Sequence, residues 1–374
     1  MQKISPANPT IRWGIIGAGN IAHQFAIGLS FLPKAKLVAI ASQTQDKAEN
    51  FSKKYNIPRI YKNYEKLAQD PEIDIVYIAT PHSMHKDNCI ICLENNKAVI
   101  CEKPFTLNYR EAQEVISHAQ QKNIFLMEAM WTRFFPVIQK IKTLIQENAI
   151  GEILIIEANF GVRVPFDPKS RLFDPKLGGG SLLDLGVYGI SFATQFLGSP
   201  EKISAQAILG STKVDEQMTT ILTYKKGATA IVYSSFLANT TQEALIIGTH
   251  GQIKIHAPFW MPQKFTITQY PKISIETKNI SPITSLKKII LDQARHYPIV
   301  KKIGKTIKKI ISPEKIITQK FIGNGYQYEA QEAMQCLWEK KAESAIMPIS
   351  DTLKTIEIMD TIRKQCGVIY PSDS

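Results

Sequence analysis

Apolar residues in the first 130 positions form short strand-like runs separated by longer helical segments. Continuous apolar runs, each a candidate strand, occupy residues 11–17, 36–42, 74–80, 97–102 and 124–128. Between them, helices are predicted, for example over residues 83–95 and 108–122. Strands that alternate with helices at this spacing form a parallel sheet covered on both faces, so the pattern predicts a doubly wound α/β fold.

A different pattern begins near residue 151. Segments with alternating apolar and polar residues, or with runs of β-branched residues, occupy residues 151–162, 202–210, 215–224, 227–238 and 242–255. The stretch KKG, residues 225–227, is a hairpin turn signal. The pattern predicts an α+β domain whose open antiparallel sheet packs one face on a core and leaves the other freer.

The first predicted strand runs into the turn GAGNIA, residues 17–22. Gly17 permits the sharp strand-to-helix turn, and Gly19 lets the backbone approach a pyrophosphate that the helix N-terminus attracts. Ala22 is small enough for the helix to pack closely on the strand. A glycine turn without a ligand is the alternative, but the position between the first strand and a helix favours dinucleotide binding.

Length and pattern together predict two domains, because 374 residues is long for one. We expect a Rossmann dinucleotide-binding domain over residues 1–130. A substrate-binding and dimerisation domain is expected over residues 131–374, with a homodimer formed through its open sheet. Helices predicted within residues 324–370 are expected to pack back on the first domain.

The tip of the second strand bears on the choice of cofactor. It reads Ser42, Gln43, Thr44, and the first carboxylate is Asp46, which is predicted to lie in the next helix. An NAD-preferring fold usually places an acid at this tip to hold the ribose 2′-hydroxyl. Its absence removes repulsion against a 2′-phosphate, although the nearest cation is Lys47, one helical turn away. The tip favours NADP without excluding NAD.

The stretch KAVICEKPFTL, residues 97–107, ends a buried strand in Glu102, Lys103 and Pro104. Ligands of doubly wound sheets bind at the carboxyl ends of strands. Glu102 and Lys103 are therefore expected at the edge where the cofactor lies. Pro104 fixes the backbone direction and disfavours a helical conformation at Lys103.

At this point the sequence resembles a known family. The stretches GIIGAGNIA, IATPHSMH, VICEKPFTL and GGGSLLDLGVYGI resemble the Gfo/Idh/MocA oxidoreductases. Residues 127–136, MEAMWTRFFP, are similar to the subgroup that contains dimeric dihydrodiol dehydrogenase and NADP-dependent D-xylose dehydrogenase. The resemblance covers about residues 11–255 and 324–370, and it implies binding of a nicotinamide dinucleotide.

The resemblance also implies the roles of individual residues. The family's cofactor contacts map onto Gly17, Gly19, Asn20, Ile21, Ser42, Gln43, Ala79, Thr80, His85, Glu102 and Lys103, with Trp131 and Arg133 near the nicotinamide. Lys103 would also contact the substrate hydroxyl, and the second catalytic segment maps onto Asp184 and Tyr188. A tyrosine at this position supports the dihydrodiol or xylose branch, since many inositol-type members have histidine there.

These catalytic candidates suit hydride transfer at an alcohol carbon. Tyrosine, with a pKa of about 10, is a poor base near pH 7, and a nearby ammonium such as Lys103 lowers that pKa. Asp184 lies four residues before Tyr188, so the two share one face if the segment is helical. Asp184 would orient the substrate or the lysine, and the triple glycine at residues 178–180 lets the backbone pass close to the ligand.

We therefore expect an NAD(P)-dependent oxidoreductase of a sugar, polyol or cyclic diol, in which Lys103 and Tyr188 assist proton transfer. One alternative is a sugar-nucleotide or inositol dehydrogenase. Another is a non-catalytic dinucleotide-binding regulator. The presence of Lys103, Asp184 and Tyr188 together favours an enzyme, because silent members of the family tend to lose them.

The stretch HSMHKDNCIIC contains His82, His85, Cys89 and Cys92 at spacings near those of metal ligands. Both cysteines fall inside a predicted helix that packs on the sheet, where cysteine is often a small buried apolar residue. We expect no metal here, and we expect His85 near the cofactor.

The net charge of +12 is concentrated in one window. Residues 286–320 contain nine lysines and one arginine against two acids, which is a net charge of +8. The window lies in an insertion, residues 256–323, that departs from the family pattern. It is expected to be a solvated helical excursion broken at Pro298, and contact with an anionic membrane surface or an acidic partner is the alternative. Nucleic-acid binding is not expected, because no recognised motif or stacking aromatic residues accompany the charge.

The remaining composition predicts a cytoplasmic protein. The N-terminus MQKISPANPT has no apolar core of a signal peptide, and five cysteines are spread without a framework pattern. No apolar run reaches the roughly 18 residues of a membrane span.

Overall fold

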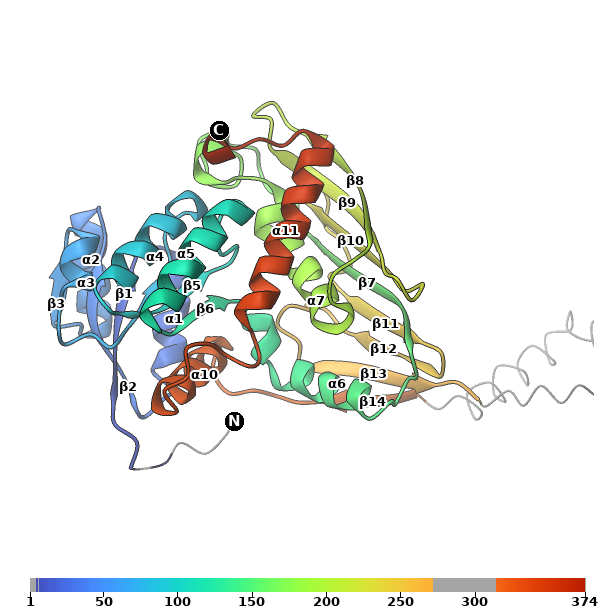
Figure 1. Ribbon diagram of the computed structural model, residues 1–374, viewed down its shortest axis with the longest axis horizontal. Helices are drawn as coiled ribbons and strands as arrows, with labels where there is room; N and C mark the ends of the chain where they lie inside the picture. Colours follow the sequence, from blue (N-terminus) through green and yellow to red (C-terminus); the bar gives the residue numbers. More distant parts are fainter. Residues whose placement is uncertain (1–4, 6, 272–313, 374) are drawn as a thin grey trace, which may run out of the picture.

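The computed structural model describes residues 5, 7–271 and 314–373. The chain forms two sheets, each accompanied by its own helices (Figure 1). The predicted fold class, a Rossmann domain joined to an α+β domain, is confirmed.

The first sheet has six parallel strands in the order β3-β2-β1-β4-β5-β6. The strands are β1 (Ile11–Ile16), β2 (Ala35–Ala41), β3 (Arg59–Tyr61), β4 (Ile75–Ile78), β5 (Ala98–Glu102) and β6 (Leu126–Ala129). The helices are α1 (Asn20–Leu29), α2 (Gln45–Tyr55), α3 (Tyr64–Ala68), α4 (His85–Glu94) and α5 (Tyr109–Lys122). Strands β4 and β5 are buried throughout, as expected of central strands covered on both faces, and the edge strand β6 is buried as well. The strand order reverses between β1 and β4, which places a ligand crevice at their carboxyl ends.

The second sheet has eight strands in the order β14-β13-β12-β11-β7-β10-β9-β8. They are β7 (Ile153–Gly161), β8 (Lys202–Leu209), β9 (Asp215–Thr223), β10 (Thr229–Ser235), β11 (Ala244–Gly248), β12 (Gly251–Ile255), β13 (Lys264–Gln269) and β14 (Glu314–Thr318). Figure 1 shows α6 (Pro136–Gln146), α7 (Val187–Leu197) and α11 (Ile349–Cys366) on one side of this sheet. Alternating burial along β9, β10 and β11 confirms that one face packs and the other is freer.

Three details of the second sheet differ from the pattern in the sequence. Strands β7 and β10 are parallel, so the sheet is mixed rather than wholly antiparallel. Residues 242–255 are two strands of a hairpin, β11 and β12, rather than one continuous segment. The predicted insertion at 256–323 contributes the paired strands β13 and β14. Residues 272–313, with Pro298 and most of the basic window, lie outside the described residues.

The C-terminal helices connect the two sheets. Helix α10 (Tyr326–Trp338) packs on α1, and a Cβ atom at Gly28 would lie 2.7 Å from Cβ of Tyr326. Helix α11 contacts α5 of the first domain and both α7 and β8 of the second. The helices expected to pack back on the first domain therefore do so, and they hold the second sheet in place as well.

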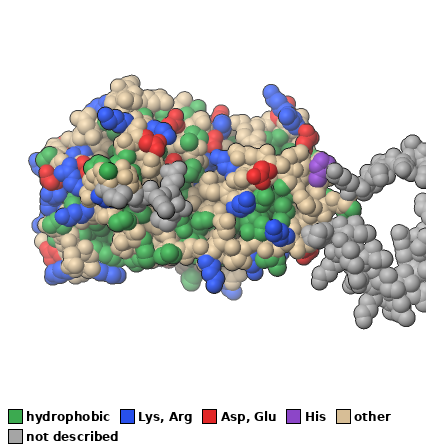
Figure 2. All heavy atoms as spheres, turned by 90° about the horizontal axis from the view of Figure 1, so that it is seen from below, with side chains coloured by type: hydrophobic (Ala, Val, Ile, Leu, Met, Phe, Trp, Pro, Cys, Tyr) green, Lys and Arg blue, Asp and Glu red, His purple; other side chains and the backbone are tan. Residues whose placement is uncertain are grey.

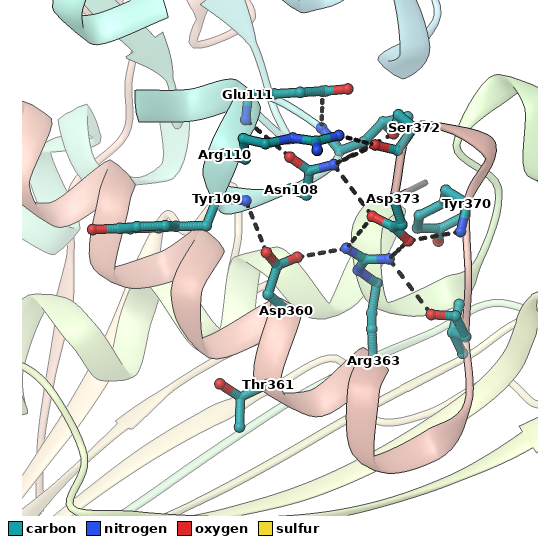
Figure 3. A network of polar contacts seen from close by, with 12 residues as sticks. Asn108, Tyr109, Arg110, Glu111, Asp360, Thr361, Arg363, Tyr370, Ser372 and Asp373 are labelled. Carbon is teal, nitrogen blue, oxygen red and sulfur yellow. Dashed lines mark hydrogen bonds and ion pairs between the residues drawn. The ribbon is translucent and has the colours of Figure 1, made fainter. Parts of the chain in front are cut away.

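A polar network fastens α11 and the end of the chain to the start of α5 (Figure 3). The Tyr109 amide donates to Asp360, at 2.8 Å, so a carboxylate occupies the positive N-terminus of α5. Arg363 is 3% exposed and pairs with both Asp360 and Asp373. Asn108, at the N-cap of α5, donates to Asp373, at 3.2 Å.

Charge on the described surface shows no single basic patch in the view of Figure 2, where Lys and Arg side chains are scattered among the others. In the described part of the chain, no helix is long and apolar enough to cross a membrane.

Candidate active site

The turn between β1 and α1 has the shape of a dinucleotide cradle. Gly17 has a φ of +101°, and a Cβ there would lie 2.5 Å from the Ala79 carbonyl oxygen, so only glycine fits. A Cβ at Gly19 would meet nothing within 4 Å. Helix α1 begins at Asn20 without a side-chain cap, so its first backbone N–H groups lack a side-chain acceptor. These features fit the phosphates of a dinucleotide.

The tip of β2 lies beside this turn. Ser42 is buried, and its hydroxyl accepts a hydrogen bond from the Thr44 amide at 3.2 Å. Gln43 is exposed, and Asp46 lies in the first turn of α2, as expected. The tip therefore holds no carboxylate of its own to face a ribose.

Lys103 follows β5 directly, and its side chain reaches from the first domain to Asp184 of the second. Its Nζ donates to the backbone oxygen of Asp184 at 2.8 Å and lies 3.3 Å from the Asp184 carboxylate. Glu102 accepts from the Lys103 amide at 3.1 Å and from the Tyr77 hydroxyl. Burial raises the pKa of Glu102, against the lowering effect of the Lys103 ammonium.

The segment that carries Asp184 begins as a π-helix, Leu182–Gly186, and continues as α7. The sequence predicted one helix, and a π-turn of this kind is frequent at functional sites. Its start is anchored from β9, because Asp215 accepts from the Ser181 hydroxyl at 2.8 Å and from the Leu182 amide at 2.7 Å. Burial raises the pKa of Asp215 to about 6.

One carboxylate oxygen of Asp184 lies close to two cations, Lys103 and Arg171, and to His82. Besides Lys103, it accepts from Arg171 at 3.0 Å, and His82 Nε2 lies 4.0 Å away. Burial alone would raise the pKa of Asp184, but Lys103 and Arg171 outweigh it and hold the pKa well below its usual range. Burial lowers the pKa of Lys103 and Asp184 raises it, with a net rise, so the lysine stays an ammonium.

Lys103 also contacts the ring of Tyr188. The Lys103 Nζ lies 4.9 Å from the centre of the Tyr188 ring. Trp131 Nε1 donates to the Tyr188 hydroxyl at 3.1 Å, and its indole stacks on Tyr326 with ring centres 4.4 Å apart. Burial raises the pKa of Tyr188 to about 12, although Lys103 acts to lower it.

An aromatic pair lies next to Tyr188. Phe160 of β7 and Trp260 stack with ring centres 3.5 Å apart and planes 7° from parallel. The centre of the Tyr188 ring is 5.6 Å from that of Phe160 and 6.5 Å from that of Trp260. The site thus combines a charged group of residues with a flat apolar one.

Other predicted site residues are fully engaged inside the protein. His85 is fully buried, and its ring nitrogens face the Pro104 and Thr80 carbonyls at 2.9 and 3.0 Å. Arg133 is 2% exposed, and its guanidinium donates a hydrogen bond to Ser191 and forms an ion pair with Asp351. The structure therefore does not bring Arg133 together with the Lys103 and Tyr188 pair.

The cysteines near His82 are buried in α4, as expected of apolar packing residues. Cys89 and Cys92 are both fully buried. Burial raises the pKa of the Cys92 thiol well above its ordinary value. Within residues 5, 7–271 and 314–373, no group of three or more His, Cys, Asp or Glu side chains could hold a metal ion.

Comparison with known proteins identifies the family to which the chain belongs. The model of an oxidoreductase family with an NAD-binding Rossmann fold, Gfo/Idh/MocA, matches residues 11–130, and that of the Gfo/Idh/MocA C-terminal domain matches residues 138–254. The chain belongs to the Gfo/Idh/MocA oxidoreductase family. It is an NAD(P)-dependent dehydrogenase.

Curated relatives match nearly the whole chain. Trans-1,2-dihydrobenzene-1,2-diol dehydrogenase from Xenopus tropicalis is 37% identical, over 96% of this chain and 99% of the relative. The enzyme of the same name from Danio rerio is 35% identical, over 97% and 99%. Among solved structures, a 3-ketoreductase from Actinomadura kijaniata with NADP and TDP-benzene has a TM-score of 0.77 at 21% identity, over 96% of this chain and 98% of that one. That last likeness supports the fold.

Four residues of this Gfo/Idh/MocA site were missing from the sequence predictions: Arg171, Asp215, Tyr326 and the aromatic partner Trp260. Each lies in a loop, strand or helix that carries no motif of its own. Tyr326 is 195 positions away from the tryptophan on which it stacks. Among these four, only Asp215 had a local sign in the sequence, the glycine at position 180, where a Cβ would lie 2.4 Å from the Asp215 carboxylate.

Proposed function

We propose that the protein transfers hydride between a nicotinamide and the hydroxyl or carbonyl carbon of a sugar, polyol or cyclic diol. In this proposal Lys103 and Tyr188 handle the proton. The observation that carries it is the meeting of Lys103, Asp184 and Tyr188 at the carboxyl edge of the first sheet, 4.9 Å separating the ammonium from the phenol ring. A phenol beside an ammonium is suited to proton transfer to or from a substrate oxygen.

The cofactor would be held by the residues that line this edge. They are Gly17, Gly19, Asn20, Ile21, Ser42, Gln43, Ala79, Thr80, Glu102 and Lys103, with Trp131 nearby. The buried His85 and Arg133, which the family resemblance also assigns to the cofactor, would act from behind this edge by holding neighbouring groups in place. When bound, it supplies the acceptance or donation of hydride. NADP is favoured over NAD, because the tip of β2 carries no carboxylate to repel a 2′-phosphate.

Tyr188 would exchange its proton with the reacting oxygen. Because Trp131 donates to the Tyr188 oxygen, the phenol is left to direct its own proton elsewhere, toward a substrate oxygen. In the oxidation direction, Lys103 lowers the cost of forming phenolate and stabilises the developing alkoxide. Asp184 keeps Lys103 protonated and holds it in place.

The aromatic pair of Phe160 and Trp260 supports a substrate with a flat apolar face, such as a sugar ring or a cyclic diol. A sugar nucleotide is the second candidate. It is favoured by Arg171, whose side chain is 50% exposed at the site and could meet a phosphate.

The outward face of the second sheet supports a homodimer. Ile221 of β9 pairs with Ile231 of β10, and Leu245 of β11 lies in the same row beyond Glu157 of β7. Ile221 is 45% exposed. The neighbouring apolar side chains of Ile221 and Ile231 on an open sheet face, in a row that also holds Glu157, fit pairing with a second copy.

The test is the variant Tyr188→Phe, assayed by the absorbance of reduced nicotinamide with pentoses, hexoses, diols and sugar nucleotides, each with NAD and NADP. General acid–base catalysis contributes about 10²- to 10⁴-fold, so turnover should fall by that factor. Dinucleotide affinity, measured by fluorescence titration, should stay within about twofold. Tyr233→Phe, on the outer sheet face, is the matched control. Unchanged turnover in Tyr188→Phe would refute the proposed role.

A further inference from the structure

His82 is buried beside the Asp184 carboxylate and has no part in the proton transfer proposed above. Its Nδ1 lies 2.9 Å from the Gly178 carbonyl oxygen. A carbonyl oxygen only accepts, so Nδ1 carries the proton and donates it. A neutral imidazole has a single N–H, which leaves Nε2 as an acceptor.

The surroundings keep this ring neutral. Burial lowers the pKa of His82 to about 3, with Asp184 acting to raise it and His85 and Lys103 acting to lower it. Near pH 7 the Nε2 atom therefore presents a lone pair. It is 4.0 Å from the Asp184 carboxylate oxygen, which is beyond hydrogen-bond distance.

That carboxylate oxygen is already occupied. It accepts hydrogen bonds from Lys103 at 3.3 Å and Arg171 at 3.0 Å, which use its two lone-pair directions. The His82 side chain keeps 8% of its surface exposed, and its Nε2 faces Asp184, the residue that Lys103 contacts. A buried acceptor is thus available at the site, and it needs a donor from outside the chain.

We propose that His82 Nε2 accepts a hydrogen bond from the substrate hydroxyl next to the one that reacts. The inference rests on the proposed function and makes His82 a specificity-determining residue of that site. One carboxylate oxygen of Asp184 lies between the Lys103 ammonium and His82, so a small diol can reach both. A substrate without the second hydroxyl leaves Nε2 unpaired, and a site built for a hydroxyl rejects such an analogue strongly.

Two variants separate the acceptor from the structural hydrogen bond. In His82→Asn, the side-chain amide nitrogen can take the place of Nδ1 and donate to Gly178, but nothing replaces Nε2. In His82→Gln, the longer amide reaches the position of Nε2 and can offer an oxygen as acceptor. The substrates are matched pairs, trans-cyclohexane-1,2-diol with cyclohexanol and D-xylose with 2-deoxy-D-xylose.

His82→Asn is expected to lower kcat/KM for the diol of each pair by at least about tenfold and for the analogue by less than about threefold. His82→Gln should recover part of the preference. Thermal unfolding and dinucleotide affinity should match the parent protein. Equal losses on both members of a pair, or no loss, would overturn the proposal. A loss accompanied by weaker dinucleotide binding would also overturn it, because the hydroxyl would then be a ribose hydroxyl.

Nitrogen-15 NMR of the histidine rings tests the same contact without turnover. The His82 signals are identified by their absence in His82→Asn and should report a neutral ring protonated at Nδ1. Adding the diol to the protein with oxidised dinucleotide should shift the Nε2 signal, and the mono-alcohol should not. An unmoved signal would overturn the inference. Failure of the proposed function is distinct, because it would appear as a parent protein that oxidises none of the substrates.

Discussion

The ammonium of Lys103 lies 4.9 Å from the ring centre of Tyr188, although Lys103 follows a strand of the first sheet and Tyr188 lies in α7, which packs on the second. Asp184 fixes this geometry by accepting from Lys103 through its backbone oxygen at 2.8 Å. Tyr188 is buried and the Lys103 side chain is only 11% exposed, so the lysine charge acts on the phenol with little screening by water. Their meeting makes the electrostatic predictions below possible.

Replacing Lys103 by methionine removes the charge that lowers the pKa of Tyr188. The limb of kcat/KM that rises with pH in the oxidation direction should then move to higher pH, and turnover should fall by at least about 10²-fold. The measurement is a pH–rate profile. Lys103→Arg keeps a positive charge and should leave the limb near its original position. A limb that stays in place in Lys103→Met would contradict the role assigned to the ammonium.

Tyr326 should matter through its ring rather than its hydroxyl. Its ring stacks on Trp131, and Trp131 orients the Tyr188 hydroxyl. Tyr326→Leu should lower kcat by about tenfold or more with a smaller change in KM, because small displacements at a reacting group are costly. Tyr326→Phe keeps the stack and should behave like the parent. If both variants lose equal activity, the stacking argument fails.

Glu128 should impose a pH dependence on stability. Burial raises the pKa of Glu128 from 4.5 to about 7. The protonated side chain therefore contributes its full stabilisation below pH 4.5, and this contribution is lost as the pH rises to about 7. Glu128→Gln cannot ionise and should gain up to about 3 kcal/mol in the free energy of unfolding over that range, relative to the parent. Urea unfolding at several pH values measures this. Parallel curves for parent and variant would show that Glu128 does not titrate in this range.

Arg363 should be worth more to stability than a surface ion pair. It is 3% exposed and holds Asp360 and Asp373 between α11 and the end of the chain (Figure 3). Arg363→Met leaves both carboxylates without their cation and should cost about 3 kcal/mol in the free energy of unfolding. Arg363→Lys, which keeps the charge but loses the fork, should cost less. Denaturant unfolding measures the free energy of unfolding of both variants. A decrease of less than about 0.5 kcal/mol in Arg363→Met would contradict the expectation.

The proposed dimer should depend on the outer face of the second sheet. Ile221→Lys places a charge beside the apolar Ile231 on this face, so the variant should elute as a monomer when the parent elutes as a dimer. Light scattering coupled to size-exclusion chromatography gives the mass. Ile60→Lys, at the 41% exposed Ile60 of β3, is the control and should remain dimeric. A dimeric Ile221→Lys would move the interface elsewhere.

Much of the fold was accessible from local pattern. A short apolar run such as residues 98–101 between polar residues is typical of a strand buried on both faces, and Gly17 has a backbone conformation that other residues resist. The strand β3, with three residues, is too short to leave a period, and the parallel pairing of β7 with β10 joins strands far apart in the chain. These features depend on packing rather than on local sequence.

The sequence by itself determined which residues could do chemistry and on which elements they lie: Lys103 after a buried strand, Asp184 and Tyr188 on one helical segment. The tertiary structure decided what those groups meet. Arg171 on Asp184, Trp131 on Tyr188 and His82 facing the same carboxylate are contacts between segments whose spacing in the chain carries no period. Hydrogen-bonded periodicity is local and can be read along the chain, whereas the docking of two sheets depends on the sum of many distant contacts.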